Sequence, residues 1–164
     1  MELKKHLNFK YIFIGLYVAS FLAFIIYGVI PTNAVDAYEI DSELSMPSIG
    51  LNSDVTKLEL GKDGLETPDT IVGSYSKNSN KTLLIGHSTT VFSNLKNVRL
   101  EDTFEYNGKT YEVRMIDMVA KNKINMNRVL QSEEKDTIVL MTCAGTLLNN
   151  GDATHRLIIT ALSE

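Results

Sequence analysis

Cys143 is the only cysteine in the chain, and it lies where a reactive thiol can be built. A cysteine nucleophile must be deprotonated, and a neighbouring imidazole that shares its proton is the usual device. His87 ends the apolar run Thr82–His87, TLLIGH, and Cys143 ends the apolar run Thr137–Cys143, TIVLMTC. Such runs predict buried strands, and strand ends open into loops where side chains meet substrate. We therefore predict Cys143 as a nucleophile and His87 as its general acid and base.

Arg156 is the predicted source of positive charge for the oxyanion that forms when a thiolate attacks a carbonyl. It lies at the start of a predicted strand, His155–Leu162, which follows the loop after Cys143. Consecutive strand residues point to opposite faces, so only one of His155 and Arg156 faces Cys143. We expect Arg156 to face inward and His155 outward, since His87 already supplies the base. Arg128 is the next candidate for the oxyanion role.

Each of these residues, taken singly, has a structural explanation. A free cysteine is among the most buried side chains, a histidine in this position is more often a loop or core residue, and an arginine is usually on the surface. Three features together favour an active site: the order of these residues along the chain, their predicted places at strand ends, and the export of the domain across the membrane that the N-terminal sequence predicts.

The run Tyr11–Ile30 contains no charged side chain and has the length of a transmembrane helix, roughly 30 Å. Lysines before it favour an N-terminus in the cytoplasm. We predict a cytoplasmic N-terminus at 1–10, a transmembrane anchor at 11–30, a stalk at 31–44 and one extracytoplasmic catalytic domain at 45–164, on the outer face of the cell membrane. The alternative is a signal peptide cleaved near Val35-Asp36-Ala37, but signal h-regions run only about 7–15 residues. Both alternatives export the domain.

The charge and cysteine content of the exported part exclude several functions. The first 30 residues carry three lysines and one glutamate, so the rest has a formal net charge of −6 and no basic patch for a nucleic acid. A lone cysteine cannot form an intrachain disulfide, and it also excludes the usual multi-cysteine zinc sites.

The elements that position these residues are predicted to be mostly strands. The segment Met46–Val55, MPSIGLNSDV, predicts an edge strand at the start of the domain, because Pro47 cannot donate to a ladder. In TFEYNGKTYEVRMI, two β-prone runs flank Asn107-Gly108, a pair that supplies the positive φ angles of a type I′ hairpin turn.

Helical signal is scarce. It is limited to the spacing of Phe92, Leu95 and Val98 and to one or two turns within Ile124–Gln131. Many short strands with few helices predict a mainly β fold, a closed or nearly closed β-barrel. The methionines at 115, 118 and 126 are expected to fill gaps in the core.

Four segments, in this order, resemble the sortases, membrane-anchored cysteine transpeptidases of Gram-positive bacterial surfaces. MPSIGLNSDV is similar to their opening strand, LLIGHS to their histidine segment, VLMTC to their TLxTC signature, and Arg156 to the arginine of their last strand. The resemblance covers Met46–Leu162. Val139 departs from the first Thr of the signature, and this bears on substrate preference more than on chemistry, because the position lies in the strand body.

The resemblance implies a closed eight-stranded β-barrel and an acyl transfer that needs no cofactor. The family cuts an LPxTG-like sorting motif between Thr and Gly, holds the Thr carbonyl on cysteine as a thioester, and passes it to an amine of a cell-wall precursor or a pilin. The implied partners are surface proteins or pilins with such a motif. Arg156 then holds the oxyanion, and Thr142 assists through its backbone or hydroxyl group.

Other functions stay open on the same residues. A hydrolytic cysteine peptidase is the near relative, and a non-catalytic, membrane-anchored binding domain with an inert Cys143 is the alternative. A papain-like protease is disfavoured by order, since there the cysteine precedes the histidine.

Two features of the chain bear on calcium and on specificity. Carboxylates within Leu100–Glu105 and at Glu59 and Asp63 are candidates for calcium, as in some family members, but scattered carboxylates are usually solvated and none has EF-hand spacing. The stretches Gly73–Asn80 and Ala120–Gln131 are predicted as the loops that select the sorting motif.

Overall fold

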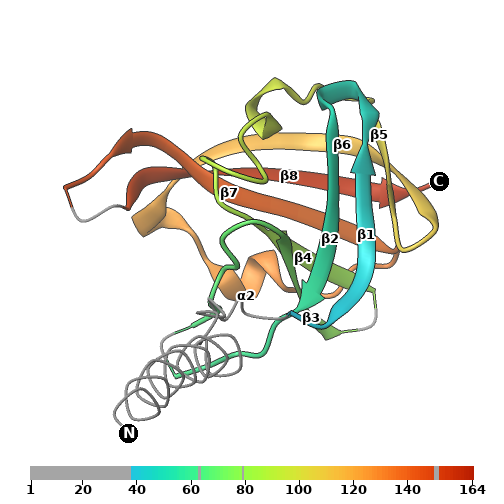
Figure 1. Ribbon diagram of the computed structural model, residues 1–164, viewed down its shortest axis with the longest axis horizontal. Coiled ribbons are helices and arrows are strands. Elements are labelled where there is room, and N and C mark those ends of the chain that lie inside the picture. The colour runs from blue at the N-terminus through green and yellow to red at the C-terminus, as the bar shows by residue number, and fades with distance from the viewer. Residues whose placement is uncertain (1–37, 63, 79, 150–151) are drawn as a thin grey trace, which may run out of the picture. The chain divides into compact units, whose positions relative to one another are not determined.

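The computed structural model describes residues 38–164 apart from 63, 79, 150 and 151 (Figure 1). The described residues form eight strands that close into one barrel, with four short helical turns between them. The strands are β1 (Ile40–Met46), β2 (Leu51–Lys57), β3 (Val72–Asn78), β4 (Lys81–Ile85), β5 (Thr103–Tyr106), β6 (Lys109–Ala120), β7 (Thr137–Leu147) and β8 (Ala153–Ser163). The turns are η1 (Pro47–Ile49), η2 (Leu95–Asn97), η3 (Lys121–Lys123) and α2 (Met126–Val129). The predicted mainly β barrel with short helices is confirmed.

The order of the strands around the barrel is β1-β2-β3-β4-β7-β8-β6-β5, and β5 pairs with β1 to close it. Two neighbouring pairs are parallel, β2 with β3 and β4 with β7, and the others are antiparallel. Parallel strands cannot be joined by a tight turn. The chain between β4 and β7 therefore makes a long crossover that includes β5 and β6.

The start of the barrel differs from the sequence-based prediction. β1 begins at Ile40, so the last residues of the predicted stalk, 40–44, belong to the sheet. The segment MPSIGLNSDV is not one strand but the turn between β1 and β2, followed by β2 itself. Pro47 begins the 3-10 turn η1, and Gly50 ends it with a φ of 67°, a left-handed conformation that favours glycine.

The predicted hairpin is confirmed. β5 and β6 pair from Thr103↔Glu112 to Tyr106↔Lys109, and Asn107 and Gly108 make the turn with φ angles of 49° and 71°. These are the positive φ values that a type I′ turn requires at both central residues. The turn therefore sets the register of β6 against β5.

The barrel has an apolar core inside and a second apolar cluster outside. On β7, Ile138 and Leu140 face the interior and Val139 faces outward, as strand alternation requires. The outer cluster joins Leu83, Ile85, Val139 and Ile158 of β4, β7 and β8. β4 is therefore buried on both faces, which explains its apolar run Leu83–Ile85.

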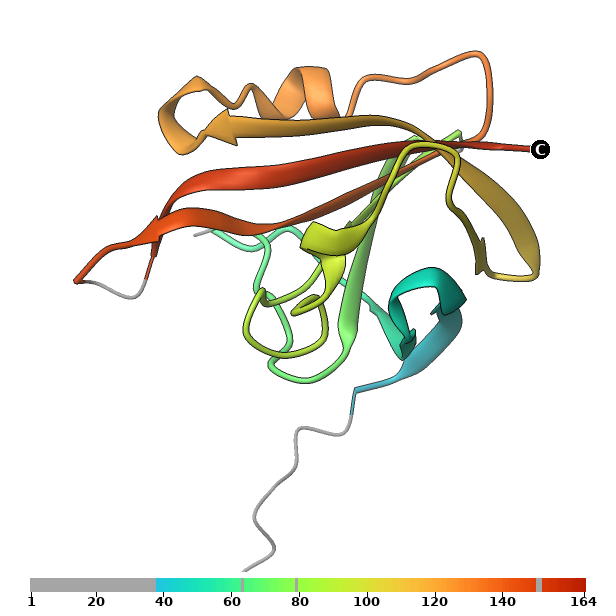
Figure 2. The ribbon, with the colours of Figure 1, turned by 90° about the horizontal axis from the view of Figure 1, so that it is seen from above.

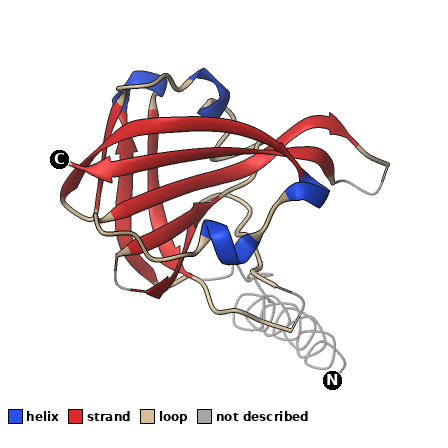
Figure 3. Ribbon diagram, turned by 180° about the vertical axis from the view of Figure 1, so that it is seen from behind, coloured by secondary structure: helices blue, strands red, loops and turns tan. Residues whose placement is uncertain are grey.

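Two loop segments cover the outer cluster. Leu58 and Leu65 come from the connection between β2 and β3, and Ile124, Val129 and Leu130 come from the segment around α2. Figure 2 shows the α2 segment on the outer side of the sheet, away from β1 and β2. Figure 3 shows the same helix from behind, beside the strands that it covers.

Other expectations are corrected. The stretch Gly73–Asn80 is mostly strand β3 rather than a loop, whereas Ala120–Gln131 contains the last residue of β6 and then only the short turns η3 and α2. The three methionines do not fill the core, because Met115, Met118 and Met126 are 47%, 65% and 37% exposed. All three side chains lie outside both the inner and the outer apolar cluster.

The predicted transmembrane anchor at 11–30 lies outside the described residues. Within 38–164, leaving out the four positions named above, none of the helices is long and apolar enough to cross a membrane.

We predict that Gly108→Val destabilises the barrel by about 1–2 kcal/mol, because a side chain other than glycine is strained at its positive φ. No atom lies within 4 Å of a Cβ added there, so strain rather than a clash sets the cost. Thermal unfolding measures the effect. Gly61→Ala is the control, since its φ is not in the positive region and its new Cβ makes only ordinary contact, at 3.4 Å from the Gly64 carbonyl oxygen. An unchanged melting temperature in Gly108→Val would contradict the turn assignment.

Candidate active site

The pairing of β4 with β7 places His87 beside Cys143. The two strands are parallel and in register, from Lys81↔Thr137 to Ile85↔Met141. His87 lies two residues beyond Ile85, and Cys143 lies two residues beyond Met141. Because side chains alternate, Cys143 shares the outward face of Val139 and Met141. The two residues therefore meet at one edge of the sheet, on the outer face of the barrel.

The sequence predicts a strand that ends at Cys143, and this prediction is wrong. β7 continues to Leu147, and its residues beyond Cys143 pair with the first residues of β8 in a two-stranded ribbon. Cys143 instead marks the point where β7 has passed its last pairing with β4, at Met141. The thiol is therefore held by a strand but has an open flank, and its side chain is partly exposed.

Arg156 is the direct cross-strand neighbour of Cys143. The antiparallel register of β7 and β8 pairs these two residues, and it pairs His155 with Ala144. Residues that are directly opposite on one face have Cβ atoms about 4.5–5.5 Å apart. The side chains of Cys143 and Arg156 thus lie on the same face of the ribbon.

Cys143, His87 and Arg156 line one cavity of about 740 Å³. Its floor includes Ile85 and Met141, the last paired residues of β4 and β7. Its walls come from the β2–β3 connection, from β3 and from the α2 segment, and they include Leu60, Leu65, Thr67, Tyr75, Lys77, Met126, Asn127 and Leu130. The volume lies within the range of about 300–1,000 Å³ that is typical of ligand sites.

Thr142 ties the histidine segment to the cysteine strand. Its side chain is buried, and Oγ1 donates a hydrogen bond of 2.7 Å to the backbone carbonyl of Gly86. Gly86 is also packed tightly, because an added Cβ would lie 2.6 Å from a methyl group of Val91 and 2.9 Å from the ring of Phe92. The carbonyl of His87 accepts from the N–H of Phe92 at 3.0 Å. The backbone on both sides of the imidazole is therefore fixed.

Asp69 is the acidic partner of His87. Its Oδ1 lies 3.7 Å from His87 Nε2, and its side chain is 96% exposed. The loop position is fixed by Thr90, whose hydroxyl donates to the Asp69 carbonyl at 2.6 Å. An exposed pair at this distance is screened by water and stabilises a charged imidazole only weakly.

The guanidinium of Arg156 is held by the start of its own strand. Nη1 donates to the carbonyls of Ala153 and His155, at 3.1 and 3.0 Å, and Nη2 donates to Asp152 Oδ1 at 2.7 Å. The side chain is only 16% exposed. Lys121 bonds the other carboxylate oxygen of Asp152. The hydrogen bonds from Lys121, from Arg156 and from the Ala153 N–H lower the pKa of Asp152 well below its usual range.

The other candidates from the sequence lie elsewhere. His155 does not line the cavity of Cys143, and its Nδ1 lies 2.8 Å from the hydroxyl of Thr154. Arg128 lines a separate cavity of about 470 Å³, together with Lys81, Val139 and Ile158. His6 lies outside the described residues.

Sequence reasoning missed the two carboxylates that contact the site, Asp69 and Asp152. Asp69 has no motif that marks it, because its proximity to His87 depends on the path of the β2–β3 connection. Asp152 lies four residues before Arg156. This spacing permits an ion pair between a loop and the start of a strand, but it does not predict one.

The calcium candidates do not form a site among the residues that the structure describes. No group of three or more His, Cys, Asp or Glu in that part of the chain can hold a metal ion. Asp63, one of the candidates, is not among the described residues.

Comparisons with solved structures identify the fold. The chain is similar to sortase A from Corynebacterium diphtheriae at 23% identity and a TM-score of 0.57, covering 77% of this chain and 61% of that one. It is also similar to sortase A of Listeria monocytogenes at 15% identity and 0.60, covering 76% and 87%. A pilus-related sortase C of Group B Streptococcus matches at 24% and 0.59, covering 78% and 68%. The chain thus spans less than two thirds of the Corynebacterium structure.

Two further comparisons concern the sequence. No curated protein matches the chain. The model of the sortase domain matches residues 44–164, which is well over half of the chain and includes the seven strands from β2 to β8 and the end of β1. The protein therefore belongs to the sortase family.

Proposed function

We propose that the protein is a cysteine transpeptidase that cleaves an LPxTG-like sorting motif through a thioester on Cys143 and transfers the acyl group to an amine. The observation that carries this proposal is that Cys143 of β7, Arg156 of β8 and His87, two residues after β4, all line one cavity. Membership of the sortase family supports the sortase-type reaction. The three residues have distinct roles in it.

In the first half of the reaction, the Cys143 thiolate attacks the carbonyl carbon of the motif's threonine. The carbonyl oxygen gains the negative charge, and the guanidinium of Arg156 stabilises it in the cavity. The C–N bond to the glycine then breaks. His87, present as imidazolium, gives its proton to the departing amine, which leaves a thioester on Cys143 and a neutral imidazole.

In the second half, an acceptor amine attacks the thioester carbonyl. Neutral His87 takes the proton of the incoming amine, Arg156 again stabilises the oxyanion, and the Cys143 thiolate leaves. The enzyme returns to its starting ion pair of thiolate and imidazolium. Water in place of the amine gives hydrolysis, which is the expected side reaction.

The substrate is an extended peptide of a surface protein or pilin. The walls of the cavity combine apolar side chains such as Leu60, Leu65 and Leu130 with polar ones such as Thr67 and Asn127, which suits a motif of mixed character. The acceptor is an amine of a cell-wall precursor or of a pilin. The enzyme acts on the outer face of the cell membrane, held there by the predicted helix at 11–30.

Cys143→Ala is expected to abolish turnover, and His87→Ala is expected to reduce it nearly as far, because the first removes the nucleophile and the second its proton donor and acceptor. Intact-protein mass spectrometry measures this on the full chain in detergent, incubated with a panel of LPxTG-like peptides. Wild-type protein should gain the mass of the N-terminal half of one peptide, and added amine should release it.

His155→Ala is the control for the histidine. It should react like the wild type, because His155 does not line the cavity. A wild-type protein that forms no adduct, and whose thiol is also unreactive toward a methanethiosulfonate reagent at neutral pH, supports the non-catalytic binding domain instead.

Arg156→Ala is expected to lower kcat by roughly two to three orders of magnitude, since the loss of one oxyanion donor costs about that much in comparable enzymes. Peptide cleavage rates measure it. Arg114→Ala is the matched control, because Arg114 pairs with Glu112 on β6 and does not line the cavity. Normal kcat in Arg156→Ala together with a large loss in Arg128→Ala would move the oxyanion role to Arg128.

A further inference from the structure

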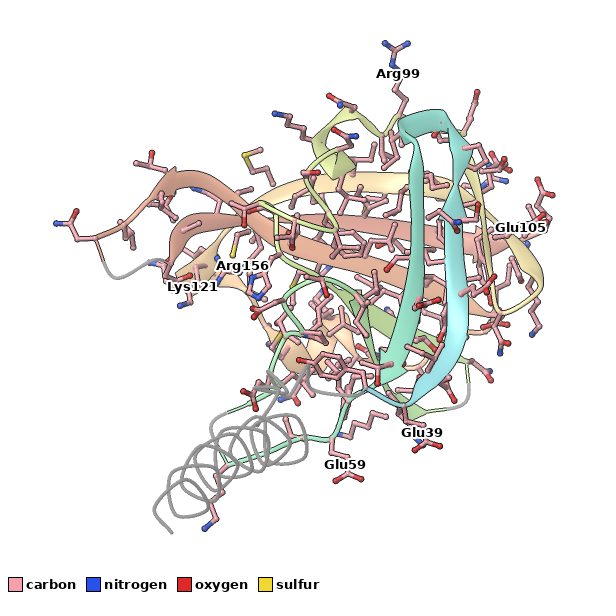
Figure 4. All side chains as sticks on the ribbon, viewed as in Figure 1. Glu39, Glu59, Arg99, Glu105, Lys121 and Arg156 are labelled. Carbon is pink, nitrogen blue, oxygen red and sulfur yellow. The ribbon has the colours of Figure 1, made fainter. Side chains whose placement is uncertain are left out.

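Three charged side chains from three segments meet beside the candidate site. Lys121 comes from η3 after β6, Asp152 from the connection between β7 and β8, and Arg156 from β8. Asp152 bonds both cations, one through each carboxylate oxygen. Figure 4 shows Lys121 and Arg156 at the same end of the sheet. Asp152 and Arg156 both line the cavity that contains Cys143.

Asp152 is itself firmly held. Its Oδ1 accepts the N–H of Ala153 at 2.8 Å in addition to Arg156, and its backbone carbonyl accepts the N–H of Leu148 at 2.7 Å. The carboxylate therefore has a fixed position relative to the ribbon of β7 and β8. Its lowered pKa keeps it ionised at neutral pH and well into the acid range.

The bonds of Arg156 divide its donors into two groups. A guanidinium has five N–H groups in a rigid plane. Two from Nη1 go to the carbonyls of Ala153 and His155, and one from Nη2 goes to Asp152. The Nε–H and the second Nη2–H donate no hydrogen bond to any of the described residues. The held donors fix the plane, and the remaining donors are available to an oxygen in the cavity.

We propose that Asp152 is a positioning residue: it sets the orientation of the Arg156 guanidinium so that the remaining N–H groups meet the oxyanion formed at Cys143. This inference rests on the proposed function, because it concerns the oxyanion of that reaction. Without Asp152, a long and flexible arginine side chain has to be oriented during each turnover. An oxyanion donor that is oriented beforehand costs no reorganisation at the moment of reaction.

The charge of the cluster argues against the opposite role, in which Asp152 would neutralise Arg156 and so prevent it from stabilising the oxyanion. A carboxylate that paired with Arg156 alone would cancel its charge. Here one carboxylate is shared by two cations, Lys121 and Arg156, so the cluster keeps a net positive charge. The positive field that an oxyanion requires is therefore retained.

The test is the steady-state cleavage of an LPxTG-like peptide by the full chain in detergent, with Asp152→Ala and Asp152→Asn. We expect Asp152→Ala to lower kcat by about one to two orders of magnitude, because a misplacement of about 1 Å can cost roughly a hundredfold. Asp152→Asn keeps one acceptor oxygen and should lose less. If Asp152→Ala does not fold, the kcat of Asp152→Asn tests the proposal in its place.

Two readouts separate positioning from a merely structural role. In an Arg156→Ala background, Asp152→Ala should lower kcat less than about twofold further, since its action passes through the arginine. The rate at which a methanethiosulfonate modifies Cys143 should stay within about twofold of wild type, since the thiolate depends on His87. An equal loss of kcat in both backgrounds would overturn the proposal.

Asp136→Ala is the matched control. Asp136 is also a doubly bonded carboxylate, which accepts from Lys109 at 2.7 Å and from the Tyr111 hydroxyl at 3.1 Å, but it does not line the cavity. Its kcat should equal that of the wild type. Wild-type or higher kcat in Asp152→Ala refutes the positioning role alone, whereas a wild-type protein that forms no thioester adduct refutes the proposed function and this inference with it.

Discussion

The parallel pairing of β4 with β7 is the constraint on which the rest of the site depends. It aligns Ile85 with Met141, so that two segments far apart in the chain leave the sheet at the same edge. A parallel pair requires a long crossover, and this one includes β5, β6 and the α2 segment. The α2 segment returns to the outer face of the same strands and covers their apolar side chains. The crossover that makes the pairing possible thus also builds one wall of the cavity.

Much of the fold follows from local signals. The apolar run Leu83–Ile85 of β4 indicates a strand buried on both faces, and Asn107-Gly108 determines both the turn type and the register of its hairpin. The order His87, Cys143, Arg156 along the chain, together with the resemblance of four segments, was sufficient to predict the barrel and the family. The roles of these three residues remain predictions. Their placement in one cavity supports those roles, because strand pairing brings together what the sequence keeps apart.

The rest depends on loops and on long-range packing. Pro47 and Gly50 make a turn inside a segment that otherwise has strand character, and β7 extends past Cys143 because β8 offers it a partner there. Whether Met118 is buried or exposed depends on whether another segment of the chain packs over its face of β6, and Met118 is exposed. The contacts of Asp69 and Asp152 depend on the paths of two connections between strands. The amino-acid composition of a loop does not determine its path, since many backbone conformations are compatible with the same polar residues.

β7 and β8 are the last two strands of the barrel in chain order, and this has a consequence for biosynthesis. A chain is made from its N-terminus at about 5–20 residues per second, so His87 emerges well before Cys143, and Cys143 emerges before its cross-strand neighbour Arg156. Pairing between distant segments also forms slowly, because the loop must close first. A chain whose synthesis has passed Cys143 but not reached β8 therefore contains Cys143 without Arg156, and β7 has no antiparallel partner yet. Arg156 reaches Cys143 only when β8 pairs with β7, so the three predicted catalytic residues come together only when the last strand has docked.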